Sequence, residues 1–500
     1  MIASDSRTCK TQRHGARTAR DHRQQAAPRH APGPLRGAPR FRPRRGHPLS
    51  GRRPGPGSSA ARPATFGQVF GVREFRPLFG SYLLSTIGDE LARVALTVLV
   101  FQRTNSTLQS ATTFAISYLP WLLGGPLLSA LADRFPRHRV LIASDVARAV
   151  LVAAMAVPGM PLPVLLALLL AVSLCGPPFE AGRSALMADV LDGDRYAVGI
   201  SLVGITSQLA QLTGFLLGGA LLMVFSPSAA LLIDAAAFAV SAAWLSLGLQ
   251  RRPPPAAELQ DGRPRTLWRD TVEGVRFLTS TARLRATVGL LWVTALFVNA
   301  PEGIAAPFGQ QLQGTAAATG LLLAAGPAGT ALGGLVVGRF CPPHVRERLL
   351  APLVALALGG VLAAGLAPLW LGGGTGSFTV VLVLLFLSGV GGACSIPLNV
   401  SIVQAVPSAY RGRAFGVAAT GLAGVQGLGV LAAGLGAEVL RPSSVVALCG
   451  GLGLLAVVAP LLAVRRSVPV GAAGTDVGAD DGGDAAHVAS GSGAEGPSVS

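Results

Sequence analysis

Three charged side chains interrupt the first long apolar stretch of the sequence, at Asp89, Glu90 and Arg93. An ionised side chain at the centre of a membrane segment costs about 2.5 to 3.5 kcal/mol on insertion scales, so such residues are candidates for a functional site. Asp89 and Arg93 are four residues apart, which places them on one helix face and predicts a pair between them. We expect Asp89 or Glu90 to carry a proton and Arg93 to tune it. The alternative is a neutralised structural pair beside a Glu90 that reaches toward water.

A short basic turn separates the second and third apolar stretches and carries Asp133, Arg134, Arg137 and Arg139. The turn is too short to be a domain and too charged to enter lipid, so it fixes two helix ends on one membrane face. Asp145 and Arg148 follow in the third stretch, three residues apart. With Asp133 and Arg134 they predict a charge network that opens and closes an inner gate, with purely structural pairing as the alternative.

Further polar side chains lie inside later apolar stretches. Gln208 and Gln211 are in the fifth, and Asn299 and Glu302 are in the seventh. Polar groups within membrane segments face a bundle interior or a cavity, so these four are candidates for contact with a substrate in a central cavity. Asp234, in the sixth stretch, is expected near the outer surface in contact with water.

The composition excludes a soluble multidomain protein. Half of the 500 residues are hydrophobic, only 13% are charged, and the mean hydropathy is +0.53, whereas soluble proteins carry about 25% charged residues. The apolar runs are continuous and do not alternate, which favours helices over a β-barrel. We therefore predict an all-α membrane protein with twelve transmembrane helices, at residues 78–101, 111–132, 139–158, 162–180, 196–224, 228–249, 286–306, 316–338, 349–370, 377–399, 413–438 and 443–464.

The arginines of the short loops predict the orientation, because positive charge collects on the cytoplasmic side. Loops after even-numbered helices carry Arg134, Arg137, Arg139, Arg195, Arg339, Arg346, Arg348, Arg411 and Arg413. Loops after odd-numbered helices carry Arg103 and Arg441. Both termini are therefore expected in the cytoplasm of a protein of the plasma membrane.

The expected domain order is a basic tail (1–70), a six-helix bundle (71–250), a cytoplasmic loop (251–285), a second six-helix bundle (286–465) and an acidic tail (466–500). The first 65 residues hold fifteen Arg or Lys against two Asp, with many Pro and Gly, which predicts a disordered segment. A start site placed upstream of the true one, or attraction to anionic lipid, are alternatives; nucleic acid is not an expected partner. No signal-peptide core follows the charges.

The turn from Leu131 to Arg139 resembles motif A of the major facilitator superfamily, roughly Gly-x-Leu-Ala-Asp-Arg-x-Gly-Arg-Arg, with Ser129 and Pro136 at the two glycine positions. The resemblance implies that Asp133 pairs across the cytoplasmic gap in the outward-open state, with Arg134 as its partner. Residues 177–195 resemble residues 396–413, as the two parallel six-helix repeats of that fold would. Residues 85–96 resemble the first helix of exporters related to enterobactin and macrolide efflux carriers.

These resemblances imply a secondary transporter that exports a small hydrophobic or cationic molecule, such as a drug, an antibiotic or a siderophore-like metabolite, by proton-coupled alternating access. An importer or facilitator of the same fold remains an alternative. So does a non-transporting sensor whose basic tail recruits a partner. Deletion of residues 1–65 distinguishes a sensor from a transporter, because a transporter keeps its flux without the tail. The sequence has no nucleotide-binding loop, catalytic triad or metal-ligand spacing, and its five cysteines are scattered. We expect no cofactor, no metal and no enzymatic activity.

Overall fold

The computed structural model describes residues 65–122, 135–252, 267–372, 374–407 and 411–466. These residues belong to one compact unit that begins at Pro63. The predicted tails lie almost entirely outside the described residues, as do Asp133 and Arg134 of the basic turn and most of the central loop. The predictions for those segments are therefore not tested by the structure.

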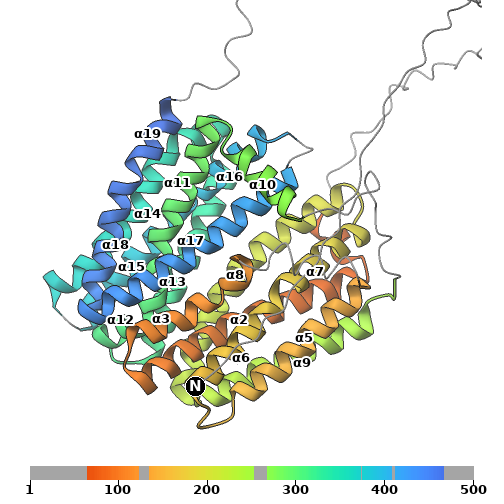
Figure 1. Cartoon of the computed structure of the whole chain (residues 1–500), viewed down its shortest axis with the longest axis horizontal. Helices are drawn as coiled ribbons and strands as arrows, with labels where there is room; N and C mark the ends of the chain where they lie inside the picture. Colours follow the sequence, from red (N-terminus) through yellow and green to blue (C-terminus); the bar gives the residue numbers. More distant parts are fainter. Residues whose placement is uncertain (1–64, 123–134, 253–266, 373, 408–410, 467–500) are drawn as a thin grey trace, which may run out of the picture. The chain divides into compact units, whose positions relative to one another are not determined.

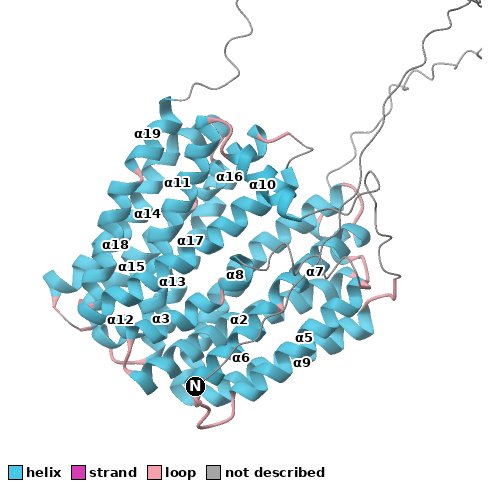
Figure 2. Ribbon diagram, viewed as in Figure 1, coloured by secondary structure: helices cyan, strands magenta, loops and turns pink. Residues whose placement is uncertain are grey.

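Every element of the described residues is a helix (Figure 2). The first group, which we call the N-terminal helices, comprises α1 (Phe66–Phe70), α2 (Phe75–Thr104), α3 (Thr107–Ile116), α5 (Arg137–Met155), α6 (Leu162–Leu174), α7 (Gly176–Val190), α8 (Asp194–Val224) and α9 (Pro227–Gly248). The all-α prediction is confirmed in this part of the chain.

The second group, the C-terminal helices, has the same character. It comprises α10 (Leu267–Leu278), α11 (Ala282–Asn299), η1 (Ala300–Ile304), α12 (Ala305–Leu312), α13 (Ala316–Phe340), α14 (Pro343–Leu371), α15 (Thr375–Gly392), α16 (Ser395–Ala405), α17 (Arg411–Val439), α18 (Pro442–Ala456) and α19 (Val458–Arg466). Several neighbours join end to end, so that α11, η1 and α12 together make one long apolar segment.

Within the described residues, nine helical segments are long and apolar enough to cross a membrane, and they coincide with the last nine predicted spans. Helices α2 and α5 are 30 and 19 residues long, but each carries more charged residues than a purely apolar span. The second predicted span, 111–132, runs beyond the described residues. A polytopic helical membrane protein is thus observed, while the count of twelve stays a prediction.

Helix ends are set by local hydrogen bonds at the short turns. Asn105 ends α2 in the left-handed region, at φ 50°, a conformation that asparagine tolerates better than most residues. Ser106 then accepts a hydrogen bond from the Gln109 amide and starts α3. Ser226 and Thr315 start α9 and α13 in the same way. Such N-caps let the chain reverse within a few residues.

Helix α2 runs through the middle of the N-terminal helices, packed against α8 and α9, while α5 packs on α9 (Figure 1). In the C-terminal helices, α15 packs between α13 and α14, and α14 also packs on α18. The two groups meet where α8 contacts α13 and α3 contacts α17. The functional side chains described below project from these central helices.

Glycines allow several of these helices to touch through their backbones, because small residues let membrane helices approach closely. A Cβ on Gly329 of α13 would lie 2.9 Å from the Gly389 Cα of α15. On α8, Gly214 and Gly218 face α2 in the same manner, whereas Gly204 faces open space. Gly214, Gly218 and Gly329 therefore lie at close helix crossings, whereas Gly204 does not.

We predict that Gly329→Ala lowers the thermal unfolding midpoint of the purified protein, because the added methyl group meets backbone atoms that cannot move aside. Overpacking of this kind costs about 1–3 kcal/mol. The matched control is Gly338→Ala on the same helix, where no atom of the described part of the chain lies within 4 Å of the added atom. The control should be neutral or stabilising, by about 0.5–1 kcal/mol. Equal midpoints for both variants would contradict the close crossing.

Candidate functional site

A cavity of about 500 Å³, which we call the α2 cavity, lies among the N-terminal helices. Residues of α2, α5, α6, α7 and α9 line it, together with residues at and beyond the end of α3. Its charged lining residues are Asp89, Glu90, Arg93, Arg148, Glu180 and Asp234. The structure thus places the three predicted α2 charges in one cavity with three charges from other helices.

Glu90 and Arg93 form an ion pair, with 2.6 Å between Glu90 Oε2 and Arg93 Nη1. The predicted pair of Asp89 with Arg93 is therefore wrong, as is a Glu90 that reaches water, since Glu90 is buried. Glu90 and Arg93 are three residues apart, a spacing that also shares a helix face. Asp89 is turned instead toward an arginine of α5. Residue spacing along α2 alone cannot predict a partner on another helix.

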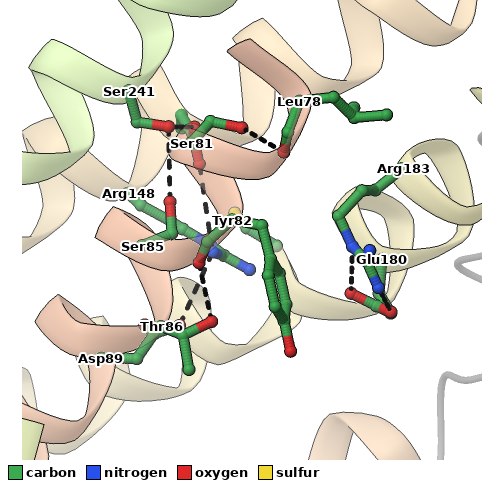
Figure 3. Close-up of polar contacts among 12 residues, drawn as sticks. Leu78, Ser81, Tyr82, Ser85, Thr86, Asp89, Arg148, Glu180, Arg183 and Ser241 are labelled. Atoms are coloured by element: carbon green, nitrogen blue, oxygen red, sulfur yellow. Dashed lines mark hydrogen bonds and ion pairs between the residues drawn. The ribbon is translucent and has the colours of Figure 1, made fainter. Parts of the chain in front are cut away.

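That arginine is Arg148, which is 5% exposed. Its Nη1 lies 3.7 Å from Asp89 Oδ2 and 4.0 Å from Asp145 Oδ1. Asp145 accepts a hydrogen bond from Ser241, whose hydroxyl also receives one from Ser85 at 3.4 Å. Figure 3 shows Ser85 and Asp89 on α2 beside Arg148 and Ser241. The guanidinium also lies over two aromatic rings, those of Phe179 and Phe238.

The predicted gate network is thus only partly tested. Asp145 and Arg148 do pair, and within the described residues their further ion-pair and hydrogen-bond partners belong to α2 and α9. Asp133 and Arg134 lie outside the described residues. Of the other two arginines in the basic turn, Arg137 forms an ion pair with Asp189 of α7, and Arg139 is exposed.

Asp234 of α9 contradicts its prediction, because it is 1% exposed and not in contact with bulk water. It stands seven residues after Pro227, the first residue of α9, or about 10 Å along the helix axis. Among the described residues, neither of its carboxylate oxygens has a hydrogen-bond partner, and a Cβ on Gly88 of α2 would collide with Oδ1. The feature of the sequence that indicates this burial is a lone acid in an apolar run.

An ion pair on α7 is a further feature that the sequence analysis missed. Glu180 pairs with Arg183, and the Arg183 guanidinium lies 4.2 Å from the ring centre of Tyr82 on α2 (Figure 3). Tyr82 and Glu180 both line the α2 cavity. The i,i+3 spacing of opposite charges inside an apolar run was available as a signal.

A second cavity, of about 460 Å³, lies between the two groups of helices, and we call it the interface cavity. All four predicted cavity residues line it: Gln208, Gln211, Asn299 and Glu302. The first two come from α8 and the others from the end of α11 and from η1. Tyr118, beyond α3, donates a hydrogen bond of 3.4 Å to Glu302. The structure therefore brings together residues that are separated by some 90 positions in the sequence.

A short chain of contacts links the two cavities. Arg93, paired with Glu90 in the α2 cavity, lies over the Phe114 ring at 5.1 Å. The Phe114 and Tyr118 ring centres are 6.4 Å apart, and Tyr118 reaches Glu302. The Glu90–Arg93 pair is thus connected to Glu302 in the interface cavity through the rings of Phe114 and Tyr118.

Comparison with known proteins gives the family. Residues 78–372 and 303–488 match the family described as the Major Facilitator Superfamily. An uncharacterised MFS-type transporter of Bacillus subtilis (strain 168), YfiS, is 27% identical over 405 residues, which are 78% of this chain and 94% of the relative. The resemblance to this superfamily is thereby confirmed, whereas the finer resemblance to enterobactin and macrolide exporters stays a prediction.

Solved structures show the same fold. A POT family transporter in complex with 5-aminolevulinic acid has a TM-score of 0.63 at 14% identity, over 81% of this chain and 98% of that one. A bacterial homologue of the human lysosomal transporter Spinster, in an inward-facing and unoccupied conformation, has a TM-score of 0.55 at 18% identity, over 79% and 95%. Together with the family match, these likenesses show that the chain belongs to the Major Facilitator Superfamily and is a multi-pass membrane transporter.

Proposed function

We propose that this protein is a secondary active transporter that exports a small hydrophobic or cationic molecule, driven by protons moving inward. The segments 71–250 and 286–465 act as two bundles that rock about the interface cavity. The observation that carries the proposal is the cavity itself, about 460 Å³ in volume and walled by both helix groups. Rotation of one wall against the other changes which side of the membrane the cavity faces.

The cavity lining suits a small molecule with both polar and apolar parts. Gln208 and Gln211 on one wall, with Asn299 and Glu302 on the other, offer hydrogen-bonding groups, and Glu302 offers an acid. Leucines, valines and alanines make up much of the remaining wall. Ligand sites commonly have this form, an apolar pocket with a few placed polar groups.

Contacts between the two helix groups support a conformation that is closed at one end, which we call the closed end. There, α2 ends, α3 begins and α17 ends. Glu438 of α17 accepts hydrogen bonds from the Ser106 hydroxyl at 2.7 Å and the Leu108 amide at 2.8 Å. Gly219 of α8 meets Gly320 of α13, where a Cβ would lie 2.9 Å from the opposite Cα. If the loop arginines face the cytoplasm, the closed end is extracellular and the conformation faces inward.

Protons enter the mechanism through the two α2 acids. Glu90 is held by Arg93 and Asp89 lies near Arg148. A proton added to Glu90 removes the charge that pairs with Arg93, and a proton added to Asp89 leaves Arg148 with Asp145 as its remaining acid. Arg93 must then find another partner or rearrange. Protonation thus favours a different helix arrangement, which is what coupling requires.

We predict that the double variant Asp89→Asn, Glu90→Gln loses proton-driven efflux in proteoliposomes, by about a hundredfold or more. Removing two coupling carboxylates deletes the groups that exchange protons, whereas substrate exchange without a gradient needs no net proton movement and should persist. The measurement compares flux driven by a pH gradient with exchange at equal pH. Asp192→Asn, at an exposed acid, is the matched control and should keep both activities.

Two results would contradict the proposal in different ways. Gradient-driven flux retained by the double variant removes Asp89 and Glu90 from coupling. The sign of the imposed pH gradient tests direction, because a proton-driven exporter moves its substrate opposite to the protons, whereas substrate that moves with the protons indicates an importer of the same fold.

We also predict that linking the closed end stops transport. Ser106→Cys with Glu438→Cys, made after the native cysteines are replaced, places two thiols where a hydrogen bond now joins α3 to α17. A short reducible cross-linker should abolish flux, and reduction should restore it, because the closed end must open for release. Each single-cysteine variant, treated alike, is the control. Full flux in the cross-linked protein would show that this end does not open.

A further inference from the structure

The two cavities of this protein are lined by different helices. Residues of α2 line the α2 cavity, and none of the described α2 residues lines the interface cavity. Conversely, α8 contributes Gln208 and Gln211 to the interface cavity, and none of its described residues lines the α2 cavity. Asp89 and Glu90 therefore belong to the first cavity, whereas Glu302 is the one acid among the described residues that line the second.

Helices α2 and α8 form a wall between the cavities, and their contact is closely packed. A Cβ on Gly214 of α8 would lie 2.6 Å from the Glu90 Cβ and 2.7 Å from the Ile87 carbonyl oxygen. A Cβ on Gly218 would lie 3.0 Å from the Val94 Cβ. Small residues allow such close approach of membrane helices. At these positions the two helices leave no space for water to pass between them.

The two α2 acids differ in their access to the α2 cavity. The Asp89 side chain is 39% exposed although it lies in the middle of α2, whereas the Glu90 side chain is 9% exposed. Asp89 lines the cavity, so this free surface faces the cavity. Glu90 is enclosed by its ion pair with Arg93 and by the contact with α8. Asp89 is therefore the α2 acid that water in the cavity reaches directly.

The α2 cavity offers the volume and the polar wall that water needs. Its volume of about 500 Å³ is far above the roughly 10–15 Å³ that one water molecule requires. The half-buried residues Tyr82, Thr86, Ser117 and Ser173 line it with hydroxyl groups. Glu180 adds a carboxylate whose side chain is 36% exposed. Buried water typically makes about two to four hydrogen bonds to such groups, so the cavity suits a cluster of water molecules.

Ionisable groups of several helices surround Asp89 and determine what a proton does there. Arg148 Nη1 lies 3.7 Å from Asp89 Oδ2 and 4.0 Å from Asp145 Oδ1. A proton on Asp89 therefore leaves Arg148 with an acid, so exchange of this proton does not isolate a buried arginine. The other ionisable groups that line the cavity or act on Asp89 are Tyr82, Glu90, Arg93, Cys175, Glu180 and Asp234.

We propose that the α2 cavity is a water-filled proton chamber, in which Asp89 exchanges protons with the solution while the transported molecule occupies the interface cavity. The inference rests on the proposed function, because it assigns a route to the protons that drive transport. The proton and the transported molecule then do not compete for one space. Their coupling passes through the ring contacts that connect Arg93 with Glu302.

The test follows protonation of Asp89 by infrared difference spectroscopy on the full chain in lipid nanodiscs, with no gradient and no transported molecule. Lowering the pH should produce the C=O band of protonated carboxyl groups, and Asp89→Asn should remove one component of that band. On transfer from ordinary to deuterated water, the Asp89 component should shift at once, because water in the cavity exchanges its proton.

Two matched substitutions fill one cavity each. Ser173 lines the α2 cavity and Ser395 lines the interface cavity, and both residues are half-buried. Ser173→Phe should abolish the fast exchange of the Asp89 component, because the added ring displaces water from the chamber. Ser395→Phe should leave that exchange unchanged, because the interface cavity is not part of the proton route.

A cysteine variant supplies a second measurement that needs no bulky side chain. Ser173→Cys is made in a chain whose native cysteines are replaced, and is treated with a permanently charged methanethiosulfonate reagent, which reaches thiols only through water. The thiol should be labelled. The control is Val100→Cys, at a residue of α2 that is 0% exposed and lines neither cavity, and its thiol should stay unlabelled.

Fast exchange retained by the folded Ser173→Phe variant, or lost equally in Ser395→Phe, would overturn the proposal. An Asp89 component that is absent at every pH, or an unlabelled thiol in Ser173→Cys, would also overturn it. The proposed function fails by a different result, namely gradient-driven flux retained by the Asp89→Asn, Glu90→Gln variant. Proton-driven transport can therefore stand while the chamber fails, and the two failures are told apart.

Discussion

The constraint on which this structure depends is the burial of charge inside a helical membrane protein. Arg148 is 5% exposed and Arg93 is paired with a buried glutamate, and neither arginine can lose its charge at any ordinary pH. Each must therefore keep a carboxylate or an aromatic ring close by. The contacts of α2, α5 and α9 meet this need, because Asp89, Asp145 and Ser241 come from those three helices to satisfy one guanidinium and its partner acid.

Such a network is stable yet sensitive to protons. Breaking a buried pair by removing one charge is costly, typically about 3–5 kcal/mol. The two acids of α2 lie on opposite sides of this arrangement, one with Arg93 and one near Arg148. The contact through Phe114 and Tyr118 to Glu302 extends it toward the C-terminal helices. Local protonation and helix rearrangement can therefore share one set of contacts.

The sequence predicted the helical membrane fold and the family, because long apolar runs and the basic turn are local patterns. It also predicted that Gln208, Gln211, Asn299 and Glu302 share a cavity, since polar groups in apolar helices must face inward. It could not assign partners. Arg93 pairs with Glu90 and not with Asp89 because Arg148 of another helix competes for Asp89, and Asp234 is buried because Gly88 leaves room for it on α2. Both outcomes depend on how helices pack, which spacing along one helix does not contain.

Alternating exposure of the interface cavity is the central claim, and the distances between the two helix groups at both ends test it most directly. Spin labels at Gln102 and Leu440 report on the closed end, and labels at Asp192 and Arg339 report on the opposite end; all four residues are exposed. Double electron–electron resonance in nanodiscs, at low and high pH, gives both distances. The account predicts that one distance grows while the other shrinks. Distances that stay fixed at both ends, or that grow together, would contradict it.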